Sequence, residues 1–97
     1  MKNIFLITTN EFLGYLKVEK GYSEKTIEAY RNDLNQFFSY INKKITSISS
    51  INKEIISDYI ATCKDKEYSL STISRKIASI RSLFKYLYLE EQLKTNI

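Results

Sequence analysis

Tight turns are hard to build in this chain, because its 97 residues include no proline and only two glycines. An all-β domain of this length needs many such turns, and they usually recruit glycine and proline. Helix interiors need neither residue. The apolar residues also recur at spacings of three and four rather than two, which is the helical period. The sequence therefore predicts an all-α fold.

Four amphipathic segments carry this helical period. The second has an apolar stripe that steps by 3, 4, 3 and 4, formed by Ile27, Tyr30, Leu34, Phe37 and Ile41. The fourth steps by 4, 3, 4 and 3, through Ile73, Ile77, Ile80, Phe84 and Leu87. Four such helices with short links indicate a bundle around one core. We predict helices from about Thr9 to Lys20, Glu24 to Asn42, Lys53 to Lys66, and Ser69 or Ser71 to Glu91.

The predicted helix ends rest on local signals. Ser23, Asn52 and either Ser69 or Ser71 stand where an N-cap is wanted, and Gly21 stands just past the end of the first helix. Residues 1–8 either extend this helix or fray. The stretch 43–50 is polar with isolated isoleucines and is predicted to be the longest loop, while residues 94–97 resemble the start of a linker.

Several functions are excluded by composition. The chain has no histidine, which rules out a Ser-His-Asp or Cys-His catalytic set. Its single cysteine, Cys63, cannot form an internal disulfide or anchor the usual zinc site, and its place on an apolar stripe indicates a core residue. No secretory or membrane-spanning segment is visible. We therefore predict a cytoplasmic protein without metal, cofactor or membrane partner.

The basic residues are unevenly distributed. The chain has a formal charge of +4, and the last predicted helix carries four basic residues and no acid: Arg75, Lys76, Arg81 and Lys85. On a helical wheel, the side opposite its apolar stripe holds Ser71, Arg75, Ala78 and Ser82, with Ser79 and Lys85 at the flanks. Small residues let a helix approach a partner closely, and serine hydroxyls can bond phosphate oxygens. This face is consistent with DNA contact and equally with an ordinary solvated surface.

The start of the second helix gives a weaker signal. Ser23, Lys25 and Thr26 lie where free backbone N–H groups and the helix dipole attract anions. The same pattern favours a simpler interpretation, in which Ser23 is an ordinary cap and Thr26 a packing residue. Neither helix decides between these interpretations by itself.

Two runs of sequence resemble a known family. The run from Ser23 to Leu34, SEKTIEAYRNDL, resembles the S-x-x-T-x-x-x-Y-x-x-D-L signature of tyrosine recombinases, the phage integrase and Xer-type enzymes. The run from Leu70 to Leu87 resembles the fourth helix of their N-terminal core-binding domain, which has an R-x-L-S-A-L-R-x-F type of pattern. Their order and separation also fit, and the resemblance covers about residues 8–96. It implies a four-helix, SAM-like orthogonal bundle over residues 1–97.

The resemblance also implies a function. In this family the core-binding domain forms half of a C-shaped clamp around the DNA of a recombination site, and its second and fourth helices cross the major groove. Carried over by position, the contacts fall on Ser23, Lys25, Thr26, Ser71, Thr72, Arg75 and Ser79, with Lys76, Arg81 and Arg31 as phosphate contacts at the edges.

In this family the catalytic residues lie in a separate C-terminal domain, and we expect none of the 97 residues to belong to it. The resemblance therefore implies a non-catalytic fragment of an integration or recombination enzyme, encoded by a bacterium or phage and associated with the nucleoid. Its further partners would be its own catalytic domain and neighbouring recombinase protomers. The first helix, around Phe12 to Leu16, would pack on such a protomer.

The residues leave one alternative from another functional class. A helical protein-interaction module would bury the Ile73–Leu87 stripe against a partner helix, as in a coiled coil, and would not bind DNA. A free-standing helix-turn-helix regulator fits less well, because that motif uses a short turn that often contains glycine, and Tyr68-Ser69 has none.

Overall fold

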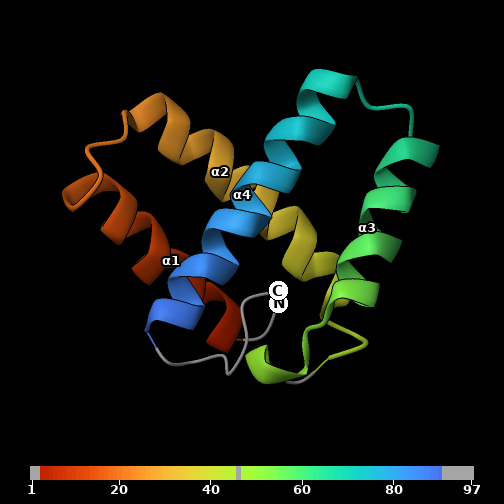
Figure 1. Ribbon diagram of the computed structural model, residues 1–97, viewed down its shortest axis with the longest axis horizontal. Coiled ribbons are helices and arrows are strands. Elements are labelled where there is room, and N and C mark those ends of the chain that lie inside the picture. Colours follow the sequence, from red (N-terminus) through yellow and green to blue (C-terminus); the bar gives the residue numbers. More distant parts are fainter. Residues whose placement is uncertain (1–2, 46, 91–97) are drawn as a thin grey trace.

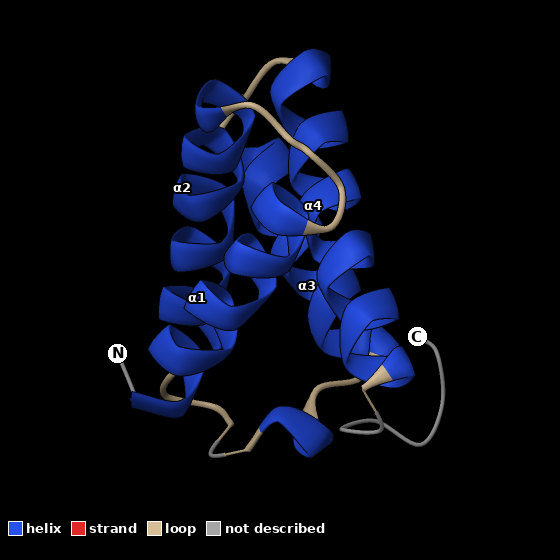
Figure 2. Ribbon diagram, turned by 90° about the vertical axis from the view of Figure 1, so that its left-hand side faces the viewer, coloured by secondary structure: helices blue, strands red, loops and turns tan. Residues whose placement is uncertain are grey.

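The computed structural model describes residues 3–45 and 47–90. It contains four α-helices, α1 (Asn3–Val18), α2 (Glu24–Ile41), α3 (Lys53–Asp65) and α4 (Leu70–Leu89), and a short 3-10 helix at Ile48–Ser50. No strand occurs within these two ranges (Figure 2), which confirms the predicted all-α class. None of the helices found there is both long enough and apolar enough to cross a membrane.

The helices are arranged around a crossing of α2 and α4. In Figure 1 both of these helices begin at the upper edge of the molecule and cross below it, with α1 on one side and α3 on the other. Helix α1 packs on α2, α3 packs on both α4 and α2, and α2 packs on α4. The two helices singled out by the sequence are therefore in direct contact with each other.

Aromatic side chains fill the centre of the bundle. Phe37 of α2 is fully buried and meets the rings of Tyr59 from α3 and Phe84 from α4 edge-on, at centroid distances of 5.3 and 6.2 Å. Rings prefer such tilted contacts because of their quadrupoles. Cys63 is also buried, as predicted, and belongs to the same core. One side chain of α2 thus joins three helices.

Helix α1 begins six residues earlier than the predicted Thr9, and the reason is burial. Phe5 is fully buried and stacks on Phe38 of α2, with ring centroids 4.7 Å apart. The Thr9 hydroxyl donates a hydrogen bond to the Phe5 carbonyl oxygen at 2.8 Å. The first turns are thereby anchored to the core from Asn3 onward, which answers the question left open for residues 3–8.

The other helix boundaries lie within two residues of those predicted. Gly21 follows the end of α1 with φ +66°, the left-handed conformation that glycine adopts without steric cost. Helix α4 ends at Leu89, so the predicted continuation to Glu91 is not confirmed, and Glu91 itself lies outside the described residues, as do residues 94–97 of the predicted linker.

The stretch between α2 and α3 contains more buried residues than its polar composition suggested. Ile45, Ile48 and Ile51 are all buried in the core, and the 3-10 helix at Ile48–Ser50 begins at the second of them. The exposed residues Lys43 and Lys44 precede them. The isolated isoleucines of the predicted loop therefore anchor this connection along its length.

The apolar stripe of α4 faces the core of its own chain. Ile73, Ile80, Phe84 and Leu87 are buried, and Ile77 is half-buried against the same cluster. The interaction module considered above needs this stripe to be available to a partner. That mode of binding is therefore wrong for this fold, because the stripe is already covered by the other helices.

Ser69 is the N-cap of α4, which settles the choice between Ser69 and Ser71. Its Oγ accepts a hydrogen bond from the Thr72 backbone N–H at 3.1 Å. We expect Ser69→Ala to lower the free energy of unfolding by about 1 kcal/mol, because this N–H would lose its partner. Urea denaturation checks this value. The matched control Ser71→Ala, at an exposed position within α4, should change it by less than about 0.5 kcal/mol. Equal effects would contradict the assigned cap.

Candidate nucleic-acid interface

Helices α2 and α4 begin with the same local structure. Ser23 Oγ accepts from the Thr26 backbone N–H at 3.2 Å and donates to Thr26 Oγ1 at 3.1 Å. Ser69 makes the equivalent pair with Thr72, at 3.1 and 3.0 Å. Serine in this position satisfies one of the backbone donors that a helix start leaves free. Both caps arise from an S-x-x-T sequence, and both stand at the upper edge in Figure 1.

The side chains around these two helix starts are mainly polar and accessible. Lys25 and Ser71 are exposed, and Thr26 and Thr72 are half-buried because each hydroxyl bonds to its capping serine. The one acid in the first turn of α2, Glu24, pairs with Lys17 of α1 at 2.6 Å, and the hydrogen bond from Lys17 lowers the pKa of Glu24. The Lys17 charge therefore offsets the negative electrostatic potential that Glu24 creates near the start of α2.

The centre of the crossing holds an ion cluster that the sequence interpretation missed. Asp33 of α2 is 1% exposed, and Arg75 of α4 donates to it from two nitrogens, Nε to Oδ2 at 2.9 Å and Nη2 to Oδ1 at 3.0 Å. Lys76 Nζ lies 3.4 Å from Oδ1 of the same carboxylate. The hydrogen bond from Arg75 to Asp33 raises the pKa of Arg75. Two of the four basic residues of α4 therefore converge on one buried acid.

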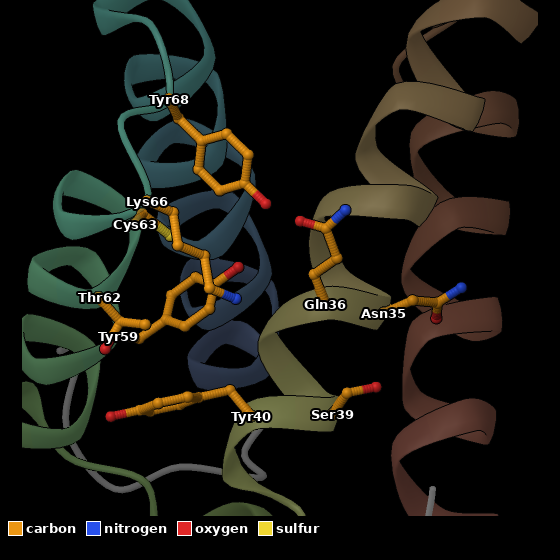
Figure 3. A pocket seen from close by; sticks show the side chains of 9 residues that line it. All are labelled: Asn35, Gln36, Ser39, Tyr40, Tyr59, Thr62, Cys63, Lys66 and Tyr68. Atoms are coloured by element: carbon orange, nitrogen blue, oxygen red, sulfur yellow. The ribbon is translucent and has the colours of Figure 1, made fainter.

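Lys76 is held by more than this acid. Its ammonium group also donates to Gln36 Oε1 and lies 5.2 Å from the centroid of the Tyr68 ring, a cation–π distance. Gln36 and Tyr68 both line a cavity of about 550 Å³ between α2 and α3. In Figure 3 they face this cavity from opposite sides, above Tyr59, whose pKa is raised by burial.

Two predicted DNA contacts on α4 are not at the surface. Lys76 is 2% exposed and Ser79 is fully buried, its hydroxyl donating to the Lys76 carbonyl oxygen at 2.9 Å. The outward placement of Ser79 and the edge position of Lys76 are therefore wrong. The helix is rotated so that its flank beside α2 is covered, and that flank carries both residues.

The two predicted arginines outside the cluster have different environments. Arg31 is half-buried and links α2 to α1, donating from Nη1 to Asn10 Oδ1 at 3.0 Å and from Nε to Glu28 at 3.3 Å. Arg81 is exposed and lies on the opposite flank of α4, where it lines a cavity of about 540 Å³ next to α3. The predicted set is thus not one continuous patch. Ser23, Lys25, Thr26, Ser71, Thr72 and Arg75 remain accessible near the helix starts and the crossing.

The predicted protomer contact of α1 also needs correction. Phe12, Leu13 and Leu16 are at most 3% exposed, because they pack in the core of this chain. They cannot cover a neighbouring molecule while the bundle is folded. The exposed apolar side chains of α1 are instead Ile4, Leu6, Ile7 and Val18.

A sequence signal for the buried cluster does exist. Asp33 falls on the apolar stripe of α2, between Tyr30 and Phe37, and Lys76 falls on that of α4, between Ile73 and Ile80. A charge on a core-facing stripe must find a partner of opposite charge, because an unpaired buried ion is very costly. Reading the two stripes together would have predicted the pairing.

The comparisons with known proteins agree with one another. Residues 9–91 match the family described as "Phage integrase, N-terminal SAM-like domain". Among curated proteins, "Tyrosine recombinase XerC" of Herpetosiphon aurantiacus is 40% identical over 87 residues, covering 89% of this chain and 28% of the relative. The protein of the same description from Thermodesulfovibrio yellowstonii is 36% identical over 96 residues, covering 99% of this chain and 31% of the relative. No solved structure matches the chain at a significant level.

Proposed function

The chain belongs to the phage integrase family of N-terminal SAM-like domains, and from this membership we propose that it binds double-stranded DNA as the core-binding half of a site-specific tyrosine recombinase. The observation that carries the proposal is the family match over residues 9–91, because this range includes both S-x-x-T helix starts and the crossing between them. The target would be the DNA of a recombination site, and the enzyme would act in integration or recombination.

The proposal assigns no catalytic step to these residues. The chain spans less than a third of the length of the curated relatives it matches. It also contains no histidine, whereas the catalytic set implied by the resemblance includes one or two. We infer that catalysis belongs to another part of a longer protein, and that residues 1–97 supply binding and orientation.

The accessible residues near the two helix starts fit a phosphate backbone. Backbone N–H groups and the positive end of the helix dipole favour anions at a helix start, and hydroxyls and cations add direct contacts. In the proposal, Ser23, Lys25 and Thr26 act from α2, and Ser71, Thr72 and Arg75 act from α4. Contact with neighbouring protomers through α1 would use Ile4, Leu6 and Ile7, which are exposed.

We expect Lys25→Ala to weaken binding to duplex DNA and to reduce its salt dependence. Each phosphate neutralised by a cation releases counterions, so the slope of log K against log salt should fall by about 0.9 for one lost contact. Fluorescence anisotropy with a labelled duplex of about 30 base pairs, roughly three helical turns, measures both quantities.

The control for this variant is Lys53→Ala. Lys53 begins α3 and is exposed, and it lies away from the upper edge where α2 and α4 begin (Figure 1). It should leave the slope within about 0.3 of the unchanged protein. If the two variants shift the slope equally, binding is non-specific and the assigned surface is wrong. Absence of any binding by the unchanged chain would overturn the proposed function and favour a role in protein interaction.

A further inference from the structure

We propose that Asp33 is a positioning residue for DNA binding: it orients the Arg75 guanidinium at the crossing of α2 and α4 and offsets part of the positive charge that Arg75 and Lys76 bring there. Arg75 then meets DNA as a hydrogen-bond donor whose direction is set before binding. The inference rests on the proposed function and deepens it, because it states how one residue of the interface acts. It separates Arg75 from Lys25, which the sequence placed in the same class.

The geometry of the pair fixes the arginine in two directions. The carboxylate receives Nε and Nη2 on separate oxygens, at 2.9 and 3.0 Å, so the plane of the guanidinium is set by Asp33. Such two-point pairing is specific to the fork of donors that arginine presents. Nη1 is not part of this pairing. The side chain of Arg75 is 46% exposed while that of Asp33 is 1% exposed, so the accessible part of the pair belongs to Arg75.

The Lys76 side chain, which contacts Asp33 from inside the bundle, is also held in place. Lys76 holds Oδ1 from inside the bundle, and it is itself held by Gln36 and the Tyr68 ring. The carboxylate therefore cannot turn away from α4 without breaking its contacts with both Arg75 and Lys76. An orientation that is set before binding avoids ordering a flexible side chain during binding.

The charge balance gives the inference its measurable consequence. An exposed lysine such as Lys25, which forms no ion pair within the described part of the chain, brings a full charge to a phosphate. Asp33 is shared by Arg75 and Lys76, so the three charges of the cluster sum to +1. In the background Lys76→Met, the remaining pair of Asp33 and Arg75 has no net charge. Removing this pair as a whole should weaken binding through lost hydrogen bonds while the salt dependence remains.

The first test uses the background Lys76→Met, in which Asp33 and Arg75 form a pair without net charge, and measures anisotropy with the labelled duplex of about 30 base pairs at salt concentrations from about 50 to 200 mM. We expect the further changes Asp33→Asn and Arg75→Ala, made together, to weaken binding about tenfold through lost hydrogen bonds and to change the slope by less than about 0.3. Adding Lys25→Ala to the same background should lower the slope by about 0.9. Equal reductions in slope would overturn the inference, since Arg75 would then act as a free cation.

The second test frees Arg75 without changing the net charge. In the double variant Asp33→Asn/Lys76→Met one negative and one positive charge are lost, so the formal charge stays at +4. The buried ion pair is removed as a whole, which proteins often tolerate. We expect the salt slope to become steeper by about 0.9 relative to Lys76→Met alone, because Arg75 is no longer neutralised. Circular dichroism with a single cooperative thermal transition establishes that each variant is folded.

A third variant shows whether this change passes through Arg75. In the background Arg75→Ala/Lys76→Met, adding Asp33→Asn should leave the slope within about 0.3. A steeper slope in this background would overturn the inference, because the carboxylate would then act on the DNA directly. If the double variant does not fold, the comparison made in the first test within the background Lys76→Met still decides. If the unchanged chain binds no DNA at all, the proposed function fails, a result distinct from all of these.

Discussion

Asp33→Ala is expected to destabilise the domain by about 3 kcal/mol or more, which is a large part of the stability of a small domain. The substitution leaves the Lys76 ammonium group 2% exposed and without its counter-ion. Gln36 and the Tyr68 ring remain and offset part of this cost. Arg75 adds little to it, because its guanidinium is half exposed and can be solvated. Urea denaturation followed by circular dichroism measures the effect.

Two control variants isolate the cause. Asp58→Ala removes an exposed acid from α3 and should change the free energy of unfolding by less than about 0.5 kcal/mol. Adding Lys76→Met to Asp33→Ala should recover most of the lost stability, because no uncompensated charge then remains in the core. A double variant as unstable as Asp33→Ala would show that the carboxylate acts through something other than Lys76.

Phe5→Ala should cost about 3–5 kcal/mol, the usual range for truncating a buried phenylalanine. The side chain is fully buried and stacks on Phe38, so its removal leaves a cavity at the α1–α2 contact. Thermal or urea unfolding measures the loss. The neighbouring Ile4 is 43% exposed, and Ile4→Ala should cost less than about 1 kcal/mol. Similar small effects of both variants would mean that the first turns of α1 are frayed in solution.

Local signals in the sequence were sufficient for much of the fold. The N-cap residues and the apolar stripes act over three or four residues, and they placed the starts of α2, α3 and α4 to within one residue. Gly21 marked the end of α1 because the positive φ that often follows a helix favours glycine over residues with a side chain. These features depend on the chain near each helix end, so one segment at a time is enough to predict them.

The errors came from contacts between distant segments. The outward placement of Ser79 and the edge position of Lys76 treated α4 as a single helix with one covered side, but α2 and α3 cover two of its flanks. The partner of Lys76 is 43 residues away in sequence. Similarly, Phe5 gained its burial from Phe38 on another helix, and no short-range pattern near Thr9 indicates that. Which side of α4 remains open therefore depends on packing that no single-helix wheel contains.

The candidate site was predicted in part. The resemblance named the two helices whose starts lie at one edge, and Ser23, Lys25 and Ser71 are exposed there. Whether they touch DNA stays a prediction. The sequence interpretation counted four basic residues on α4 as an excess, and it did not connect them with an acid on α2. Asp33 changes that balance, because it takes Arg75 and Lys76 as partners.

The buried cluster also sets an order in which this sequence can change over evolution. A lineage that loses Asp33 first passes through a form with an uncompensated lysine in its core, and selection would remove it. A lineage that replaces Lys76 first keeps Asp33 paired with Arg75, and the later loss of the acid then leaves no buried charge. Only one of the two mutational paths between the charged and the neutral core is therefore open. The lysine must be lost before the aspartate.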